Sequence, residues 1–280
     1  LEVFRSLMIS IIIRTLNEGR HLEALLQSIS DQDLNDEYEV IVIDSGSTDD
    51  TVDIARSFGV RLDFIEKSKF SFGRSLNQGC DLARGECLVF VSGHCIPKDQ
   101  QWLAELIKPI KSSDAGYVYG RQLGTDDSKF SEKQIFAKYF PDHDQPSNFG
   151  HFANNANACI SKTVWQKYKF NEEITGLEDM ELAARFVNNG GKVVYAEKAA
   201  VFHIHDETWS QTFRRYEREA QAMKMFAPEL HLSFGETARF FFASVLHDWS
   251  KALEDRELAR NLLPVVAFRA AYFFGTFYGG

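Results

Sequence analysis

The chain has 280 residues, of which 44% are hydrophobic and 25% charged, as is typical of a soluble globular protein with a full core. Its formal net charge of −9 argues against an exposed nucleic-acid-binding surface, so we expect no nucleic-acid partner. The four cysteines show no CxxC spacing, which favours free thiols in a reducing cytoplasm. No stretch reaches the roughly 18 apolar residues that a membrane-spanning helix needs.

Two continuous apolar runs in the first 60 residues predict strands that are buried on both faces. The first covers 7–13 and precedes an amphipathic helix over 21–30. The second covers 39–43 and precedes a helix over 51–58, with a polar turn beginning at Asp44 between them. This strand–helix–strand–helix order predicts an α/β fold with a parallel sheet, whose ligands bind beyond the carboxyl ends of the strands.

Two polar segments follow the next strands. A basic, glycine-containing loop over 67–77 carries Lys69 and Arg74, which could bind an anion with help from the positive N-terminus of the following helix. A solvated loop is the plainer alternative. The fourth strand, 86–91, runs directly into Ser92-Gly93-His94.

A second chemical centre lies late in the chain. Glu178 and Asp179 open a helix, where a well-placed carboxylate can act as a general base. Acidic residues in a first helical turn also simply stabilise the helix dipole, so the two interpretations stay open. His203 and His205 follow on an expected edge strand over 199–205, and residues two apart on a strand point to the same face.

The last part of the chain predicts helices. The segment 206–227 is rich in arginine, and its cations could either approach a diphosphate or pair with acidic neighbours on the same helix. From residue 233 on the chain is rich in aromatic residues with interleaved basic ones. Such amphipathic helices pack on the domain, form a homodimer, or lie on a membrane surface, and the pattern does not choose between these.

The order of these motifs resembles the family 2 glycosyltransferases. A first strand ends in Thr15-Leu16-Asn17-Glu18, the second carries Val-Ile-Asp-Ser-Gly-Ser-Thr-Asp at 42–49, and Ala-Arg-Gly-Glu follows at 83–86. The resemblance covers roughly residues 7 to 220. It implies a GT-A fold, which is an α/β fold with a Rossmann-like, mostly parallel central sheet flanked by helices, here with a C-terminal helical extension. It also implies inverting sugar transfer from a nucleotide-diphosphate sugar.

The resemblance divides the chain by role. It implies a nucleotide-sugar-binding half over 1–100, an acceptor-binding and catalytic half over 101–205, and a helical extension over 206–280. Asp179 is then the catalytic base, and Glu178 beside it positions the acceptor or raises the pKa of Asp179. The residues expected to bind the nucleotide or the donor sugar are Thr15, Asn17, Glu18, Asp44, Ser45, Arg74, Ser92, Gly93, His94 and Asn155.

One departure from the family concerns the metal site. The family usually has Asp-x-Asp where this chain has Ser92-Gly93-His94, so the first carboxylate is missing. The resemblance still implies a divalent metal held by His94 and His203, with His205 as the second choice. An imidazole ligand favours Mn²⁺ over Mg²⁺. An enzyme that works without metal is the alternative.

The expected partners are a nucleotide-diphosphate sugar and a saccharide or lipid-linked saccharide acceptor, in bacterial surface polysaccharide or glycolipid synthesis. The expected location is the cytoplasm, with the inner face of the membrane as a further option. The missing carboxylate leaves open a catalytically weak sugar-nucleotide-binding protein of the same fold. A dinucleotide-dependent oxidoreductase is disfavoured because no G-x-G-x-x-G follows the first strand.

Overall fold

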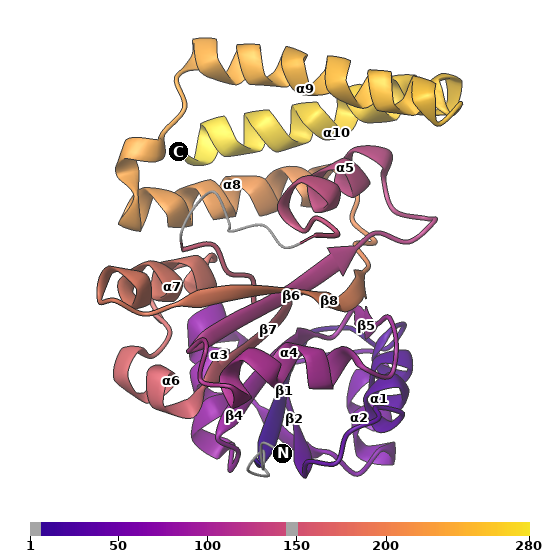
Figure 1. Ribbon diagram of the computed structural model, residues 1–280. Helices are drawn as coiled ribbons and strands as arrows, with labels where there is room; N and C mark the ends of the chain where they lie inside the picture. Colours follow the sequence, from indigo (N-terminus) through magenta and orange to yellow (C-terminus); the bar gives the residue numbers. More distant parts are fainter. Residues whose placement is uncertain (1–6, 144–150) are drawn as a thin grey trace. The chain divides into compact units, whose positions relative to one another are not determined.

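The computed structural model describes residues 7–143 and 151–280, and its contacts divide the chain into two units (Figure 1). The first unit comprises Leu1–Leu123, Phe140–Glu173 and Glu178–His203. The second comprises Gly124–Tyr139, Ile174–Leu177 and Ile204–Gly280. The division into donor and acceptor halves at residue 100 remains a prediction about function.

The first unit is built on one sheet with the strand order β3-β2-β1-β4-β7-β6-β8-β5. Its strands are β1 (Ile9–Thr15), β2 (Tyr38–Asp44), β3 (Arg61–Phe64), β4 (Cys87–Ser92), β5 (Cys95–Pro97), β6 (Tyr117–Leu123), β7 (Asn157–Ser161) and β8 (Val193–His203). Its helices are α1 (Leu22–Ser30), α2 (Thr51–Ser57), η1 (Lys67–Lys69), α3 (Phe72–Leu82), α4 (Trp102–Lys111), α6 (Lys162–Tyr168) and α7 (Glu178–Asn188). The α/β architecture expected from the sequence is therefore confirmed.

Strand direction decides which side chains meet. β1 pairs in parallel with β2 and β4, and β2 with β3. β7 is antiparallel to both β4 and β6, and β8 is parallel to β6. Two successive reversals leave β6 and β8 pointing the same way as β1 and β4. The ends of β1, β2, β4, β6 and β8 therefore share one edge of the sheet, which we call the carboxyl edge.

The expectation of a separate edge strand over 199–205 is wrong in two respects. A single strand, β8, spans the whole region and ends at His203. Its pairing with β6 shifts register between Gly120 and Arg121. β8 is also internal, because the short strand β5 covers its outer side.

Burial explains the central strands. Ile9, Ile11, Ile12 and Ile13 of β1 are fully buried, because helices cover both faces of the sheet. A strand in this position cannot alternate apolar and polar side chains, and so its sequence is continuously apolar. All four cysteines are buried as free thiols.

The second unit is helical, with α5 (Phe130–Tyr139), α8 (Trp209–Phe226), η2 (Pro228–Leu230), α9 (Phe234–Glu254) and α10 (Leu258–Gly279). Within it α10 lies between α8 and α9 (Figure 1). Capping boxes begin two of the helices, Thr208 with Gln211 at α8 and Ser233 with Glu236 at α9.

The expectation that no segment is long and apolar enough to span a membrane is wrong for α10. Its 22 residues are long and apolar enough, by length and composition, to cross a membrane. A buried ion pair argues that this helix packs within the unit, because Arg269 binds both carboxylate oxygens of Asp248 on α9 at 2.7 and 2.8 Å. Asp248 is completely buried, so the charge of Arg269 compensates it.

Candidate active site

Two loops at the carboxyl edge are joined by hydrogen bonds between them. They are the β1–α1 loop, which contains Asn17 and Glu18, and the β2–α2 loop. Asn17 adopts a left-handed conformation with a φ of 57°, which asparagine tolerates well. Its amide N–H donates to Ser47 Oγ and its side-chain oxygen accepts from the Thr48 N–H, both at 2.8 Å. The Glu18 N–H donates to Thr51 Oγ1 at 2.8 Å, so the two loops form one rigid rim.

Asp44 and Ser45 organise this rim from beneath. The carboxylate of Asp44 accepts hydrogen bonds from Thr15 Oγ1 at 2.9 Å and from the N–H groups of Gly46 and Ser47. Ser45 Oγ donates to the Thr15 carbonyl oxygen at 2.9 Å. Asp44 is only 1% exposed and its oxygens are occupied by protein donors, so its visible role is to shape the loop.

The Ser92-Gly93-His94 triplet brings an imidazole to the same edge. His94 Nδ1 lies 2.8 Å from Glu18 Oε1. A Cβ at position 93 would lie 2.7 Å from Glu18 Cγ, so a larger residue there would displace the Glu18 side chain that contacts His94. His203, at the end of β8, has its Nδ1 2.7 Å from Gln122 Oε1. The two imidazole rings stack with centroids 5.1 Å apart, so the structure brings together the pair that the sequence predicted.

Each imidazole is oriented through Nδ1 by an oxygen atom. This arrangement is typical of metal-binding histidines, in which the second nitrogen faces the ion. His205 belongs to the second unit, and its Nδ1 lies 2.8 Å from Glu132 Oε1 on α5. Glu132 is 2% exposed and also accepts from Arg215 Nη2 at 2.9 Å, so it forms a buried charged cluster in that unit.

The acidic pair lies at the first turn of α7. Asp179 Oδ2 accepts a hydrogen bond from the Asn155 N–H at 2.8 Å, and Tyr117 Oη donates to Asn155 Oδ1 at 2.6 Å. Burial, followed by the neighbouring charge of Glu178, raises the pKa of Asp179 from 3.8 to about 7. A carboxyl group with this pKa can accept a proton efficiently near neutral pH. The side-chain nitrogen of Asn155 is buried and has no hydrogen-bond partner within 7–143 and 151–280.

Arg14 is a functional candidate that the sequence did not single out. It lies at the end of β1, with its Nη1 3.6 Å from Glu178 Oε1 and its guanidinium 4.8 Å from the centre of the Phe72 ring. Nη1 is buried without a hydrogen-bond partner among the described residues. Register also places Arg14 beside Ser92 of β4. The only signal in the sequence is its position directly before Thr15, where a strand reaches the edge.

Arg74 makes contacts within the protein. Its Nε donates to Glu172 Oε2 at 2.9 Å and its Nη1 donates to the Lys69 carbonyl oxygen at 2.6 Å. Its side chain remains 45% exposed, so it is accessible to a ligand although it is paired. Asn77 on the same helix also contacts Glu172, at 2.9 Å, which fixes this carboxylate beside α3.

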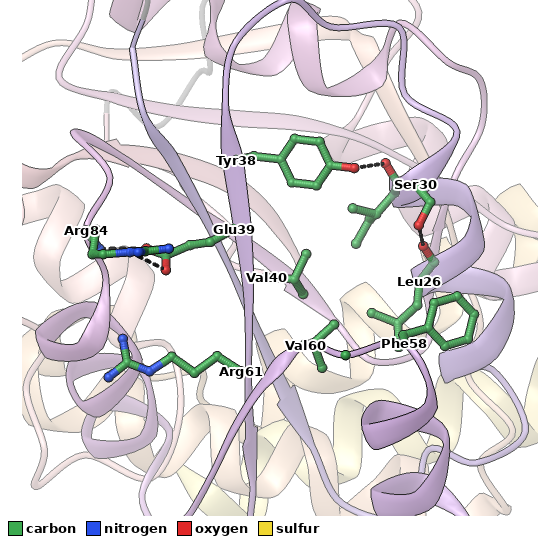
Figure 2. Close-up of a pocket in the computed structure, with 11 residues that line it drawn as sticks. Leu26, Ser30, Tyr38, Glu39, Val40, Phe58, Val60, Arg61 and Arg84 are labelled. Carbon is green, nitrogen blue, oxygen red and sulfur yellow. Dashed lines mark hydrogen bonds and ion pairs between the residues drawn. The ribbon is translucent and has the colours of Figure 1, made fainter.

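A cavity of about 520 Å³ lies away from all these residues. Figure 2 shows its apolar wall, which includes Val40 and Val60, and the two arginines Arg61 and Arg84. Tyr38 and Arg61 begin β2 and β3, so the cavity lies at the amino ends of the strands. Its lining contains none of the expected site residues and gives no support to a ligand at the carboxyl edge.

A series of contacts links the acidic pair on α7 to the Ser92-Gly93-His94 triplet at the carboxyl edge. Arg14 and Ser92 are neighbours there, and the Ser92 N–H donates to the Ala156 carbonyl oxygen. The residue before Ala156 holds Asp179, while Arg14 contacts Glu178. The candidate base and His94 therefore belong to one region of the first unit.

The architecture matches known sugar transferases. The mannosyltransferase PcManGT from Pyrobaculum calidifontis, solved with GDP-Man and Mn²⁺, superposes with a TM-score of 0.66 at 17% identity over 97% of this chain and 86% of that chain. Glucosyl-3-phosphoglycerate synthase from Mycobacterium tuberculosis, solved with Mn²⁺, UDP-glucose and phosphoglyceric acid, has a TM-score of 0.58 at 18% identity, covering 78% and 79%. The sheet, its helices and these neighbours define a GT-A glycosyltransferase fold.

Sequence comparisons give the family. The model of glycosyl transferase family 2 matches residues 10–172, more than half of the chain, and the chain belongs to this family. It is 30% identical over 195 residues to the O-antigen chain rhamnosyltransferase WbaN of Salmonella anatum, covering 65% of this chain and 61% of WbaN. It is 28% identical over 221 residues to RfbN of Salmonella typhimurium, also an O-antigen chain rhamnosyltransferase, covering 74% and 70%.

Proposed function

We propose that the chain is an inverting glycosyltransferase in which Asp179 is the general base. The observation that carries this proposal is a buried carboxyl group at the carboxyl edge whose pKa is raised to about 7. The alternative of a sugar-nucleotide-binding protein with little activity is not favoured, because the relatives are named as transferases.

The proposed step is a direct displacement. The acceptor hydroxyl oxygen forms a bond to the anomeric carbon as the bond from that carbon to the diphosphate oxygen breaks. Asp179 takes the hydroxyl proton, and the nucleoside diphosphate leaves with the electron pair of the broken bond. Because attack and departure occur on opposite faces of the sugar, the configuration inverts and no covalent enzyme intermediate forms.

One unpartnered donor supports an oxygen-rich ligand beside Asp179. Asn155 Nδ2 is buried without a hydrogen-bond acceptor in the described part of the chain. Leaving such a donor unsatisfied costs about 1–3 kcal/mol, which a bound hydroxyl or phosphate oxygen would recover. We assign Asn155 to the bound sugar substrates and Arg14 to the positioning of Glu178.

We assign the rim formed by the two joined loops to the nucleotide. Asn17 and Glu18 would face the base and ribose, while Thr15, Asp44 and Ser45 keep the rim in shape. Arg74 on α3, with Ser92 at the end of β4 and Gly93 directly after it, would bind the diphosphate. The internal contacts of Asp44 support a role through loop geometry more than through direct contact.

The imidazoles of His94 and His203 fit a divalent cation. Glu18 and Gln122 orient the two rings through Nδ1, and nitrogen donors suit Mn²⁺ better than Mg²⁺. Both structural neighbours named above were solved with Mn²⁺. When bound, such an ion would offset the negative charge of the diphosphate.

The substrates follow from the relatives as a proposal. We propose that the donor is a nucleotide-diphosphate sugar, with a rhamnosyl donor as the first candidate. The proposed acceptor is a saccharide or a lipid-linked saccharide in bacterial surface-polysaccharide synthesis. The reaction would take place in the cytoplasm.

The first experiment is a thermal-shift screen of nucleotide sugars with and without Mn²⁺. A donor at about 100 times its Kd stabilises the native state by about 2.7 kcal/mol, which is readily measured. Donors that stabilise the protein are then tested for transfer to saccharide acceptors, comparing the wild type with Asp179→Asn. Binding by both proteins and turnover by the wild type alone is the expected result. Turnover by the variant would remove Asp179 from its role.

A further inference from the structure

The outer face of α9 carries large apolar side chains in solvent. Phe242, Leu246 and Leu253 are 62%, 64% and 64% exposed. A neighbouring face of the same helix, with Val245, Asp248 and Ala252, is buried in the second unit. A helix whose buried face is already satisfied has no need of a second apolar face for its own folding.

The exposed side chains form a continuous stripe. Phe242, Leu246 and Leu253 are separated by four and seven residues, which places them on one side of an α-helix. The half-buried Trp249 continues the four–three–four spacing, which is the spacing of a helix that packs against another helix. Small exposed residues, Ala243 and Ser250, lie beside the stripe and would let a second helix approach closely.

If two copies of this helix pack antiparallel, the positive end of each face meets the negative end of the other. Arg239 precedes Leu246 by about 10.5 Å along the axis and Glu254 follows it by about 12 Å, at roughly 1.5 Å per residue. A twofold axis near Leu246 and His247 would therefore bring Arg239 of each helix opposite Glu254 of the other. Both residues are exposed. A parallel arrangement would bring Arg239 against Arg239 and lose this complementarity.

We propose that α9 pairs with α9 of a second copy of this chain, antiparallel and about a twofold axis near Leu246. An interface of this kind uses the same patch on both subunits. It goes beyond the transferase activity, because no residue of the proposed catalytic site takes part in it.

The surface area that this face could bury indicates a weak, reversible dimer. Each of the three large side chains offers roughly 100 Å² of exposed apolar surface, on a scale of about 150–250 Å² for a large aromatic side chain. With Arg239, Ala243, Ser250 and Glu254 at its margin, the pair would bury in total roughly 1,000–1,200 Å², the lower end of specific interfaces. We therefore expect a reversible dimer with a dissociation constant in the micromolar range.

The experiment is sedimentation equilibrium of the 280-residue chain over a wide concentration range, without detergent. The expected mass rises from that of the 31.9 kDa monomer toward twice that value. Leu246→Glu places two charges at the axis and should weaken the dimer at least about thirtyfold, as at an interface hot spot. Phe64→Glu, at a 51% exposed aromatic residue on β3, is the matched control and should leave the dissociation constant unchanged.

Charge exchange tests the antiparallel register. Arg239→Glu should weaken the dimer about tenfold, because each of two exposed pairs becomes repulsive. Adding Glu254→Arg should restore most of the affinity, even though Glu254 also loses its 2.8 Å pairing with Lys251 on its own helix. Circular dichroism of each variant checks that the fold is kept.

Three results would overturn the proposal. The wild type could stay monomeric at every concentration, Leu246→Glu could dimerise as well as the wild type, or the double exchange could fail to recover the loss. Flotation of the monomeric wild type with phosphatidylethanolamine–phosphatidylglycerol vesicles, abolished by Leu246→Glu, would instead assign the stripe to a lipid surface. The proposed α9–α9 dimer would be supported if Leu246→Glu abolishes dimerisation and if adding Glu254→Arg to Arg239→Glu restores it.

Discussion

Replacing Asp179 by Asn should abolish transfer and, at alkaline pH, make the protein more stable. Burial raises the pKa of this carboxyl group from 3.8 to about 7. A raised pKa means that the folded state prefers the neutral carboxyl group, so its contribution to stability is complete below pH 3.8 and is lost as pH rises through 7. At pH 8 the ionised group therefore costs roughly 4 kcal/mol of unfolding free energy.

The substitution also has a cost of its own. The two oxygens of Asp179 accept hydrogen bonds from the N–H groups of Asn155 and Met180, both at 2.8 Å. An asparagine side chain offers only one acceptor to these two donors, which costs about 1–3 kcal/mol. The net expectation at pH 8 is a stabilisation of about 1–3 kcal/mol. At pH 5 the folded carboxyl group is neutral but the unfolded one, with a pKa of 3.8, is mostly ionised, so the cost in the wild type falls to about 1.6 kcal/mol. The variant should then be about equally or less stable than the wild type, because the lost hydrogen-bond acceptor offsets this gain.

Urea unfolding at the two pH values measures the stability difference, and transfer assays on the same preparations measure turnover. For the wild type, kcat/KM should rise with pH, with about 10% of Asp179 ionised at pH 6 and about 90% at pH 8. A stability difference that is the same at pH 5 and pH 8 would refute the assigned protonation state.

The matched control is Glu178→Gln. This change removes the like charge that helps raise the pKa of Asp179, so the acidic limb of the pH profile should move to lower pH while transfer persists. An unchanged profile would show that the two carboxylates do not interact.

Three other changes test separate parts of the structure. Arg14→Met removes the cation that lowers the pKa of Asp179, so the acidic limb of the pH–rate profile should move to higher pH. His203→Ala should weaken Mn²⁺-dependent donor binding at least about tenfold in calorimetry, while nucleotide binding without metal stays the same. Arg269→Met leaves the carboxylate of Asp248 buried and unpaired and should cost about 3–5 kcal/mol in urea unfolding; adding Asp248→Leu should recover most of this loss.

The first half of the fold was predictable because it is encoded locally. Continuous apolar runs at β1, β2 and β4 identify central parallel strands, and the polar residues that end them identify the carboxyl edge. The path of β7 between β4 and β6 was not predictable in this way. It depends on pairings between segments far apart in the chain, such as Phe90 with Ala158, which leave no local pattern.

In the candidate site, too, residues placed by local sequence were predictable and residues placed by long-range packing were not. His94 and His203 were expected together and lie together, because His94 closely follows the end of β4 and His203 ends β8 at the same edge. Arg14 was missed because its contact with Glu178 exists only after β1 and α7 pack together. Asp44 was expected to bind the ligand, but its oxygens accept hydrogen bonds from the loop. Sequence spacing cannot reveal these hydrogen bonds.

The reversed direction of β7 has a consequence for how such enzymes diversify. Because β7 runs against β4, its amino end meets the carboxyl edge, and Asn155 enters the site from the segment that precedes this strand. If Asn155 contacts the bound sugar substrates as proposed, insertions or deletions in that segment would change the contacts to the sugars while the loops after β1 and β2 keep their geometry. Acceptor preference could then be exchanged between relatives by grafting this one segment, with the nucleotide preference inherited from the recipient.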